Sequence, residues 1–354
     1  MRYTEPMAEK VDSIVDRNFD YYSDILQDSK TNTTVERPAH ETRKPYKLVS
    51  LFSGCGGMDL GFRGDFQFLN KFYERLPFEI IWANDLNKYA CETYKQNLGQ
   101  DIRCGDIWSH IDDLPDTDNV DLVIGGFPCQ DISVNGKGKG VAGERSGLYR
   151  AMVEVVRRLQ PQIFVAENVK GLLMKHNKAS LERVLSDFTA LGYNVSLKLF
   201  NSAEFCVPQS RERVLIFGVR NDLHGFSIPN GMIEKNGWTT AERAISDLEG
   251  LEENAVPNHI WSKAKSSAEQ GNRRLIADRV GYTIRAECHG NIQFHYKLNR
   301  RISMREAARI QSFPDDFIFH ARLRETERQI GNAVPPVLAW HIADHIARYL
   351  DEIV

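Results

Sequence analysis

Short apolar segments that end in glycine or polar residues recur along this chain, and helical patterns separate several of them. The apolar segments cover residues 47–52, 79–83, 120–124, 163–166 and 214–219, and the helical patterns cover 88–98, 148–159 and 181–191. Alternation of strand, loop and helix is typical of an α/β fold, in which helices cover both faces of a mainly parallel sheet. Ligands of such sheets bind beyond the carboxyl ends of the strands. The polar residues that follow these segments are therefore the first candidates for a functional site.

The alternation holds for only part of the 354 residues, a length that suggests about two domains. Residues 1–45 are polar, with apolar positions at helical spacing that predict one amphipathic helix. Residues 46–220 carry the alternation and are expected to form the main domain. Residues 221–300 lack it and predict a smaller domain, whereas 301–354 become helical again and are expected to return to the main domain.

Charge is distributed unevenly along the chain. The whole sequence has a net charge of -3, with 45 basic and 48 acidic residues. Between residues 271 and 305, eight basic residues oppose only Asp278 and Glu287. The eight are Arg273, Arg274, Arg279, Arg285, Lys297, Arg300, Arg301 and Arg305. A local basic region on an acidic body suits a polyanionic partner, although chance clustering on a solvated surface is the alternative.

Several classes of protein are disfavoured by composition. The six cysteines form no CxxC pair and no paired histidines complete a zinc site, so we expect no metal. No segment approaches the roughly 20 apolar residues of a membrane helix, and the N-terminus does not resemble a signal peptide. We therefore expect a cytoplasmic protein with reduced thiols and no membrane contact.

A glycine-rich loop follows the first apolar segment. It comprises Phe52, Ser53, Gly54, Cys55, Gly56 and Gly57, and it precedes a helical pattern. Such glycines let the backbone approach a nucleotide-like ligand, although a tight structural turn explains them equally well. Asp85 ends the next strand, where a carboxylate accepts ribose hydroxyls, and Asp106 follows about 20 residues later. A glycine loop and two acids without a pyrophosphate pattern favour S-adenosylmethionine as the cofactor.

Three further strand ends carry reactive side chains. Cys129 follows Pro128 just beyond a buried strand, which suggests a thiolate nucleophile rather than a packed thiol. Glu167 ends another strand and suggests an acid that contacts a ring nitrogen, the alternative being a structural glutamate bonded to backbone. Arg211 and Arg213 lie two apart on an extended segment, so that both are expected to address one ligand. A surface ion pair with Glu212 is the alternative.

Together these segments resemble the DNA cytosine-5 methyltransferases of bacterial restriction-modification systems. Residues 51–57 are similar to the family's cofactor loop, Gly126-Phe-Pro-Cys-Gln130 to its catalytic loop, and Glu167-Asn-Val169 to its Glu-Asn-Val motif. Residues 209–213 resemble its Gln-x-Arg-x-Arg motif. Residues 301–314 and Gly331-Asn-Ala-Val334 resemble its last two motifs. The resemblance runs in the usual order from about Lys47 to the end.

The resemblance implies a function and a set of site residues. It implies a class I methyltransferase sheet with a target-recognition domain, and transfer of a methyl group from S-adenosylmethionine to C5 of a flipped-out cytosine. Cys129 would add to C6 of the base, with Glu167, Arg211 and Arg213 completing the catalytic set. The cofactor-site residues implied beyond the glycine loop are Asp85, Leu86, Asp106, Ile107, Pro128, Asn332 and Val334. The implied DNA contacts are Gln130, Ser133, Thr283 and Arg285.

The implied partner is double-stranded DNA, bound by a monomeric, nucleoid-associated protein whose cognate restriction endonuclease, if present, acts separately. Two alternatives stay open. A transfer-RNA cytosine-5 methyltransferase shares the scaffold, but its branch carries a Cys-Phe-Thr signature that this sequence lacks. A catalytically inactive DNA-binding regulator would have lost the nucleophile, yet Cys129 and Glu167 are both present.

Overall fold

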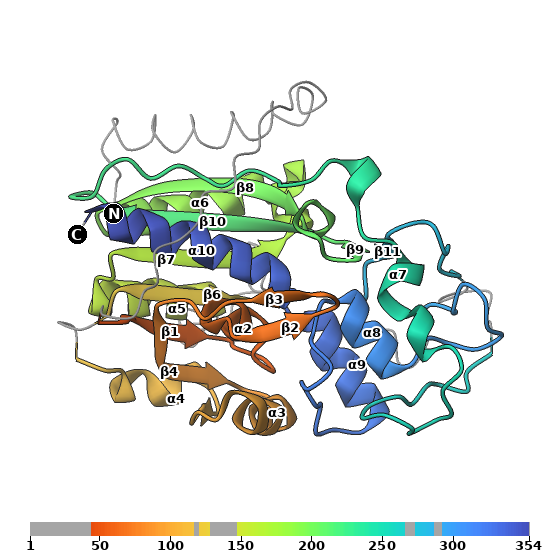
Figure 1. The fold of residues 1–354 in the computed structure, drawn as a ribbon. Helices are drawn as coiled ribbons and strands as arrows, with labels where there is room; N and C mark the ends of the chain where they lie inside the picture. The colour runs from red at the N-terminus through yellow and green to blue at the C-terminus, as the bar shows by residue number, and fades with distance from the viewer. Residues whose placement is uncertain (1–43, 117–119, 128–146, 266–272, 287–291, 354) are drawn as a thin grey trace. The chain divides into compact units, whose positions relative to one another are not determined.

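A computed structural model describes residues 44–116, 120–127, 147–265, 273–286 and 292–353. The predicted N-terminal helix, Pro128, Cys129, Gln130 and Ser133 lie outside these ranges. The chain divides into two compact units. Within the described ranges, the first unit covers residues 44–51, 107–200 and 212–230, and the second covers 52–106, 201–211 and 231–353. Figure 1 labels most of the helices and strands of both units.

The first unit is built on a mainly parallel sheet. Its strands are β1 (Tyr46–Leu51), β6 (Leu122–Gly126), β7 (Ile163–Val169), β8 (Tyr193–Asn201) and β10 (Glu212–Arg220). They lie in the order β1-β6-β7-β10-β8. β6 pairs in parallel with both β1 and β7, whereas β10 runs antiparallel to β7. The helices of this unit are α4 (Ile107–His110), α5 (Leu148–Leu159) and α6 (Lys178–Thr189).

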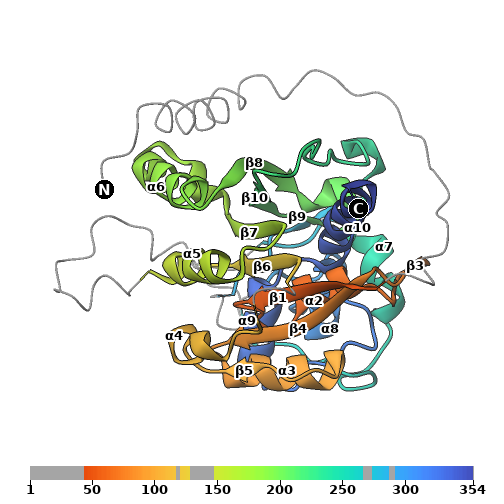
Figure 2. The same ribbon diagram turned by 90° about the vertical axis from the view of Figure 1, so that its left-hand side faces the viewer.

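Packing in the first unit follows from its apolar strands. Helices α5 and α6 lie on the same side of the sheet (Figure 2). Phe164 of β7 stacks on Phe188 of α6 with ring centroids 4.3 Å apart. Gly218 of the neighbouring strand is required there, because a Cβ would lie 1.9 Å from the Phe164 ring. The core of this unit therefore fixes the position of β7, whose end carries Glu167.

The second unit contains the eight-residue strand β4, several shorter strands and most of the α-helices of the described ranges. Its strands are β2 (Phe66–Phe68), β3 (Lys71–Tyr73), β4 (Phe78–Asp85), β5 (Arg103–Cys104), β9 (Gln209–Ser210) and β11 (Gly281–Tyr282). Its helices are α2 (Gly57–Arg63), α3 (Lys88–Leu98), α7 (Ala241–Ile245), α8 (Met304–Ile310), α9 (Leu323–Asn332) and α10 (Pro336–Ile353). β4 pairs in parallel with β5, and β9 pairs in parallel with β11. β2 and β3 form an antiparallel hairpin.

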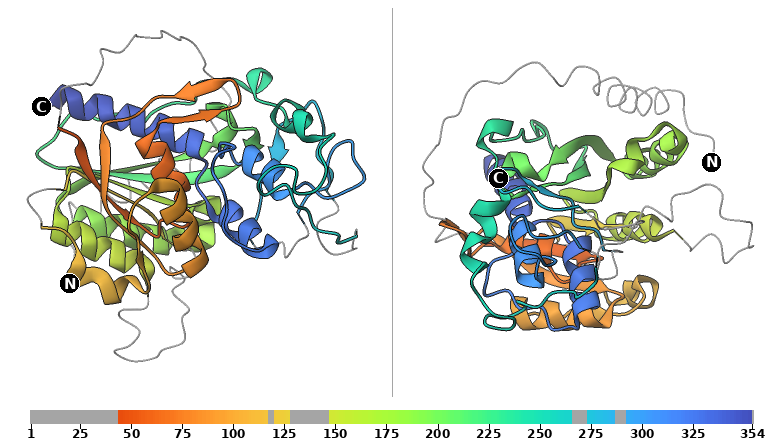
Figure 3. Two further views of the ribbon diagram at one scale, coloured as in Figure 1. Left: turned by 60° about the horizontal axis from the view of Figure 1, so that its bottom comes forward. Right: turned by 90° about the vertical axis from the view of Figure 1, so that its right-hand side faces the viewer.

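Helix α10 packs closely against α2, the helix that follows the glycine loop (Figure 3). A Cβ on Gly61 would lie 2.4 Å from the Cβ of Ala339 and 2.6 Å from the carbonyl oxygen of Pro336. The β2–β3 hairpin braces the same helix, because the Trp340 indole donates to the carbonyl oxygen of Glu74 at 2.8 Å. The insertion at residues 64–78, to which the sequence assigned no role, forms this hairpin.

The predicted α/β class is confirmed by the mainly parallel pairing and by the solved structures compared below. One difference is that β10, which ends the series of predicted strands, is antiparallel to its neighbour β7. The division into compact units does not test the predicted boundaries at residues 220 and 300, which stay a prediction. None of the helices in the described ranges is long and apolar enough to cross a membrane.

Candidate active site

The glycine loop of the second unit turns through left-handed backbone conformations. Gly54 has φ +57° and Gly56 φ +93°, values that favour glycine. Phe52 has φ 54°, which is uncommon for a residue with a side chain. The amide of Ser53 donates to the carbonyl oxygen of Asn84 at 2.9 Å, which ties the loop to the end of β4. The loop thus lies beside Asp85, as the sequence predicts.

The Asp85 carboxylate organises the two segments around it. Oδ2 accepts a hydrogen bond from the Gly54 amide and Oδ1 accepts one from the Asn87 amide, both at 2.8 Å. Burial raises the pKa of the Asp85 carboxyl, while these two amides and the positive charge of Arg328 act in the opposite direction. Each carboxylate oxygen has more than one lone pair, so that both can still accept ribose hydroxyls.

Asn84 and Asn87, on either side of Asp85, hydrogen-bond the segments that surround this carboxylate. Asn84 Nδ2 donates to the carbonyl oxygens of Arg103 at 2.7 Å and Gly105 at 3.0 Å, which fixes the segment before Asp106. Asn87 caps helix α3 by accepting from the amides of Tyr89 and Ala90, and it also contacts Glu325 of α9. An asparagine directly before a helical pattern is an N-cap signal that could have identified Asn87. No local sequence pattern could have identified Glu325.

The segment with Asn332 and Val334 packs directly on the glycine loop. A Cβ on Gly57 would lie 2.6 Å from the carbonyl oxygen of Val334 and 3.1 Å from the Cβ of Ala333. Cys55 donates to the carbonyl oxygen of Gln329 at 3.8 Å, and burial raises the pKa of its thiol. Cys55 is therefore a packed thiol, and the second unit brings the loop, Asp85, Asp106 and residues 332–334 together.

These residues fit an adenosine-containing cofactor. Gly54 leaves the loop backbone open, because no Cβ there would meet another atom within 4 Å, whereas Gly56 and Gly57 are buried against neighbouring residues. Leu86 beside the carboxylate is 73% exposed, an apolar surface suited to a base. Ile107, the remaining predicted cofactor residue in the described ranges, is buried and belongs to the first unit. Within those ranges, no three His, Cys, Asp or Glu side chains gather as metal ligands would.

Glu167 of the first unit forms an ion pair with Arg213. The two side chains are nearly buried, with Arg213 Nε 2.8 Å from Glu167 Oε1. β7 and β10 place them together, because Arg213 pairs with Val169 and Leu215 with Glu167 in the antiparallel register. The alternative partner proposed from sequence, Glu212, instead lies 3.0 Å from Lys170. A buried carboxylate held by a guanidinium at a strand end is suited to contact a polar ring.

Gly126 and Phe127, which precede Cys129 in the sequence, are held at the same strand end. Gly126 leaves room for the carboxylate, because a Cβ there would lie 2.9 Å from Glu167 Oε2. The side chain of Asn168 donates to the carbonyl oxygen of Phe127 at 2.9 Å. Both residues of the Glu-Asn motif therefore contact the chain two or three residues before Cys129, which itself lies outside the described ranges.

Arg211, which the sequence groups with Arg213, has different partners from Arg213. Arg211 is 1% exposed and belongs to the second unit, where Nη1 donates to the carbonyl oxygen of Ile284 at 3.0 Å. Its Nη2 donates to the carbonyl oxygens of Gly331 and Ala333 at 2.7 and 3.1 Å. Thr283, a predicted DNA contact, donates to the carbonyl oxygen of Ser210, and Arg285 is exposed.

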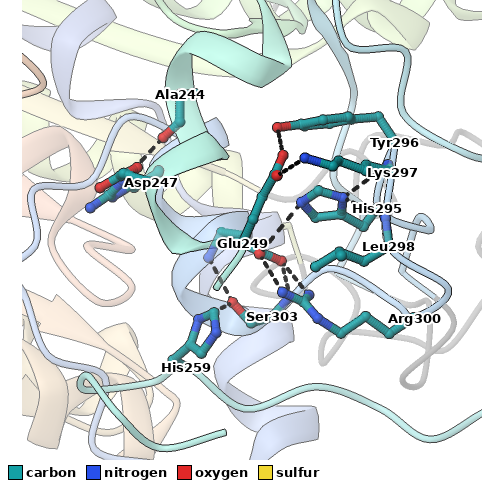
Figure 4. A network of polar contacts seen from close by, with 12 residues as sticks. Ala244, Asp247, Glu249, His259, His295, Tyr296, Lys297, Leu298, Arg300 and Ser303 are labelled. Carbon is teal, nitrogen blue, oxygen red and sulfur yellow. Dashed lines mark hydrogen bonds and ion pairs between the residues drawn. The ribbon is translucent and has the colours of Figure 1, made fainter. Parts of the chain in front are cut away.

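Fewer basic side chains of residues 271–305 are exposed than the sequence of this region contains. Arg301 and Arg305 are each 1% exposed and donate to backbone carbonyls. Arg300 forms two 2.7 Å hydrogen bonds to buried Glu306, and Lys297 lies 2.7 Å from Glu249 (Figure 4). Arg301 and Arg305 therefore contribute no exposed charge to this basic region. The exposed residues are Arg273, Arg274, Arg279 and Arg285, together with the ion-paired Lys297.

Comparisons with known proteins show the family of this chain. The family model for C-5 cytosine-specific DNA methylases matches residues 46–276 and 262–348. The chain belongs to this family. It is 38% identical over 327 residues to the Type II methyltransferase M.NgoFVII of Neisseria gonorrhoeae, covering 83% of this chain and 84% of that protein. It is 35% identical to M.FnuDI of Fusobacterium nucleatum, covering 86% and 95%.

Solved structures show the same fold for this C-5 cytosine-specific DNA methylase. A DNA modification methyltransferase encoded within an E. coli prophage superimposes with a TM-score of 0.63 at 21% identity, covering 86% of this chain and 99% of that one. The Dnmt2 methyltransferase of S. pombe gives 0.66 at 18% identity, covering 87% and 99%. The family model and the curated relatives confirm the predicted family and enzyme activity, and the solved structures confirm the fold class. S-adenosylmethionine is the methyl donor that the family implies.

Proposed function

We propose that the enzyme methylates C5 of one cytosine within a specific short sequence of double-stranded DNA. The observation that carries this proposal is the buried Glu167–Arg213 pair beside Gly126, which lies three residues before Cys129 in the sequence. A thiol and a fixed carboxylate are the two groups that activation of a cytosine ring needs. Thiolate addition makes C5 nucleophilic, and a carboxyl group that donates a hydrogen bond to N3 stabilises the negative charge that develops there.

The chain's residues perform the steps around a flipped-out base. The Cys129 thiolate forms a bond to C6, and the electron pair of the C5–C6 bond moves toward C5. Glu167 contacts N3 and the exocyclic amine, while Arg213 holds the Glu167 carboxylate in place. S-adenosylmethionine, when bound, supplies the electrophilic methyl group. Loss of the C5 proton to a base then re-forms the C5–C6 double bond and expels the Cys129 thiolate. We propose no metal, because thiolate and carboxylate supply the activation.

The cofactor is proposed to lie against the glycine loop. Asp85 would accept the ribose hydroxyls, Leu86 and Asp106 would contact the adenine, and the loop backbone would approach the amino-acid end. The proposed cofactor residues are Phe52, Ser53, Gly54, Cys55, Gly56, Gly57, Asp85, Leu86, Asp106, Ile107, Pro128, Asn332 and Val334. Binding of S-adenosylhomocysteine, the demethylated product, to the enzyme tests this proposed cofactor site.

Residues 221–300 are proposed to read the DNA. Gln130, Ser133, Thr283 and Arg285 would contact the DNA beside the target base. Exposed arginines would hold phosphates, and loops of this region would contact base edges in the major groove. We propose a monomer acting on nucleoid DNA in the cytoplasm. A cognate restriction endonuclease, where one exists, would act on the same sequence as a separate protein.

The proposal is tested by transfer of labelled methyl from S-adenosylmethionine to unmethylated plasmid DNA, followed by bisulfite sequencing. Cys129→Ser serves as the matched variant. We expect methylation at one short recurring sequence, and no transfer by the variant. Transfer to total RNA instead of DNA would support a transfer-RNA methyltransferase. Binding of DNA and cofactor without transfer would support a regulatory protein.

A further inference from the structure

Arg211 lies between two segments of the second unit that the proposed function assigns to different ligands. On one side is the backbone of residues 283–285, with two proposed DNA contacts, and on the other is 331–334, with two proposed cofactor contacts. The segments touch directly, because a Cβ on Gly331 would lie 2.4 Å from the amide nitrogen of Ala286. The Arg211 guanidinium bonds both, through Ile284 on one side and Gly331 and Ala333 on the other.

Two buried glutamines extend this connection. The side chain of Gln209 accepts from the Ile284 amide at 2.9 Å and donates to the side chain of Gln311. Gln311 Nε2 in turn donates to the carbonyl oxygen of Ala333 at 2.5 Å. Both glutamines are fully buried. The Ile284 peptide and the Ala333 carbonyl are thus each held twice, once by Arg211 and once through the glutamines.

The network continues into the glycine loop through backbone packing. Val334 follows Ala333, and its carbonyl oxygen is the atom that would lie 2.6 Å from a Cβ on Gly57. A shift of residues 331–334 therefore changes the surface against which the start of α2 and the glycine loop rest. Because interiors are closely packed, such a shift is not absorbed locally.

We propose that Arg211, with Gln209 and Gln311, is a positioning residue that fixes the cofactor-side segment 331–334 against the DNA-side segment 283–285. This inference rests on the proposed function, and it differs from a role for Arg211 in touching the base. The guanidinium is suited to the task because its planar fork can address several carbonyls that diverge from one point. A lysine at the same position has one nitrogen and lacks the fork by which Nη1 and Nη2 address the two segments separately.

The chain offers a matched control in Arg305. It is also 1% exposed, and Nε, Nη1 and Nη2 donate to the carbonyl oxygens of Pro257, Pro314 and Phe317, each at 3.0 Å. None of these carbonyls belongs to the segments that the network joins. Arg211→Lys and Arg305→Lys therefore remove comparable buried hydrogen bonds, but only the first acts on 331–334.

The experiment measures the affinity of each full-length variant for S-adenosylhomocysteine without DNA, and then kcat and KM for S-adenosylmethionine at saturating DNA. We expect Arg211→Lys to weaken the affinity for S-adenosylhomocysteine about tenfold or more. We expect its KM to rise more than its kcat falls. Arg305→Lys should leave both quantities near wild type. Unchanged affinity for S-adenosylhomocysteine with a lowered kcat would overturn the proposal and make Arg211 a catalytic residue. An equal loss of this affinity in Arg305→Lys would also overturn it, because general destabilisation would then explain the effect.

Gln311→Met decides the question if Arg211→Lys does not fold. It removes the donor to Ala333 but keeps the volume and leaves Arg211 in place, so a weaker affinity for S-adenosylhomocysteine is expected again. An unchanged affinity in this variant would overturn the proposal. Failure of the proposed function is read separately, from a wild-type enzyme that neither binds S-adenosylhomocysteine nor transfers methyl to DNA.

Discussion

At the scale of single residues, Arg213 and Lys170 form ion pairs that differ in burial, and we expect them to differ in their effect on methyl transfer. Arg213 pairs with Glu167 where both side chains are nearly buried, whereas Lys170 pairs with exposed Glu212. We expect Arg213→Met to lower the rate of methyl transfer about 100-fold, because a misplaced Glu167 no longer fits the base. Lys170→Met should stay within about twofold of wild type, since exposed pairs contribute little. Initial rates on plasmid DNA measure both, and equal rates in the two variants would contradict this role of Arg213.

Sequence reasoning located the residues of the candidate site better than their partners. Asp85 and Glu167 could be predicted because strand ends and glycines mark them locally. The partner of Glu167 depends on the register between β7 and β10, which no local pattern specifies. The burial of Arg301 and Arg305 could not be predicted either, because their acceptors are carbonyls of residues such as Ile292 and Pro257.

At the scale of elements, the contact between α2 and α10 is close enough to exclude a methyl group. We expect Gly61→Ala to lower the free energy of unfolding by about 3 kcal/mol, because its Cβ would meet backbone atoms of Pro336 and Trp340. Gly250→Ala is the control, with no atom within 4 Å of its added Cβ, and should change stability by less than about 0.5 kcal/mol. Urea unfolding compares them, and similar midpoints would argue against tight packing here.

Long periodic elements were predicted best, and short ones were missed. Helices α3 and α5 have the bounds that the helical patterns predict. Strand β8 was missed because its polar and half-exposed residues, such as Asn194 and Lys198, interrupt any apolar run. β9 and β11 have two residues each, too few for a period, and they form because distant segments pair.

At the scale of the whole molecule, we propose that a chain of net charge -3 binds DNA through a few exposed basic residues. Arg279 is exposed in the proposed recognition region, whereas Lys297 is also exposed but paired with Glu249. We expect Arg279→Gln to reduce the slope of log affinity against log salt by about 1, the value for one phosphate contact. Lys297→Gln should leave the slope unchanged. A salt titration of DNA binding tests this, and unchanged slopes in both variants would remove Arg279 from the contact.

Stability should depend on pH through two buried histidines of the polar cluster in Figure 4. Burial lowers the pKa of His259 and His295 below 6.5, against the opposing charge of Glu306. Below pH 6.5 these histidines therefore bind protons more readily in the unfolded chain than in the folded one. Their contribution to the free energy of unfolding is fully present above this pH and is lost as the pH falls. The expected slope is about 1.4 kcal/mol per pH unit for each histidine at most.

Urea unfolding at pH 7.5 and pH 5.5 measures that dependence, with His295→Gln and the exposed His320→Gln compared with wild type. We expect a smaller loss of stability at low pH in His295→Gln only. The same loss in all three proteins would show that carboxylates alone cause it.

The central claim is that Cys129 bonds to C6 of a cytosine in DNA, and trapping that bond tests it most directly. Duplex DNA containing 5-fluorocytosine is incubated with enzyme and S-adenosylmethionine, because fluorine at C5 cannot leave as a proton does and the adduct persists. We predict an enzyme–DNA complex that survives denaturation, requires 5-fluorocytosine, and maps to the peptide with Cys129. Methyl transfer to ordinary DNA without any trapped complex, or a complex at another cysteine, would contradict the account.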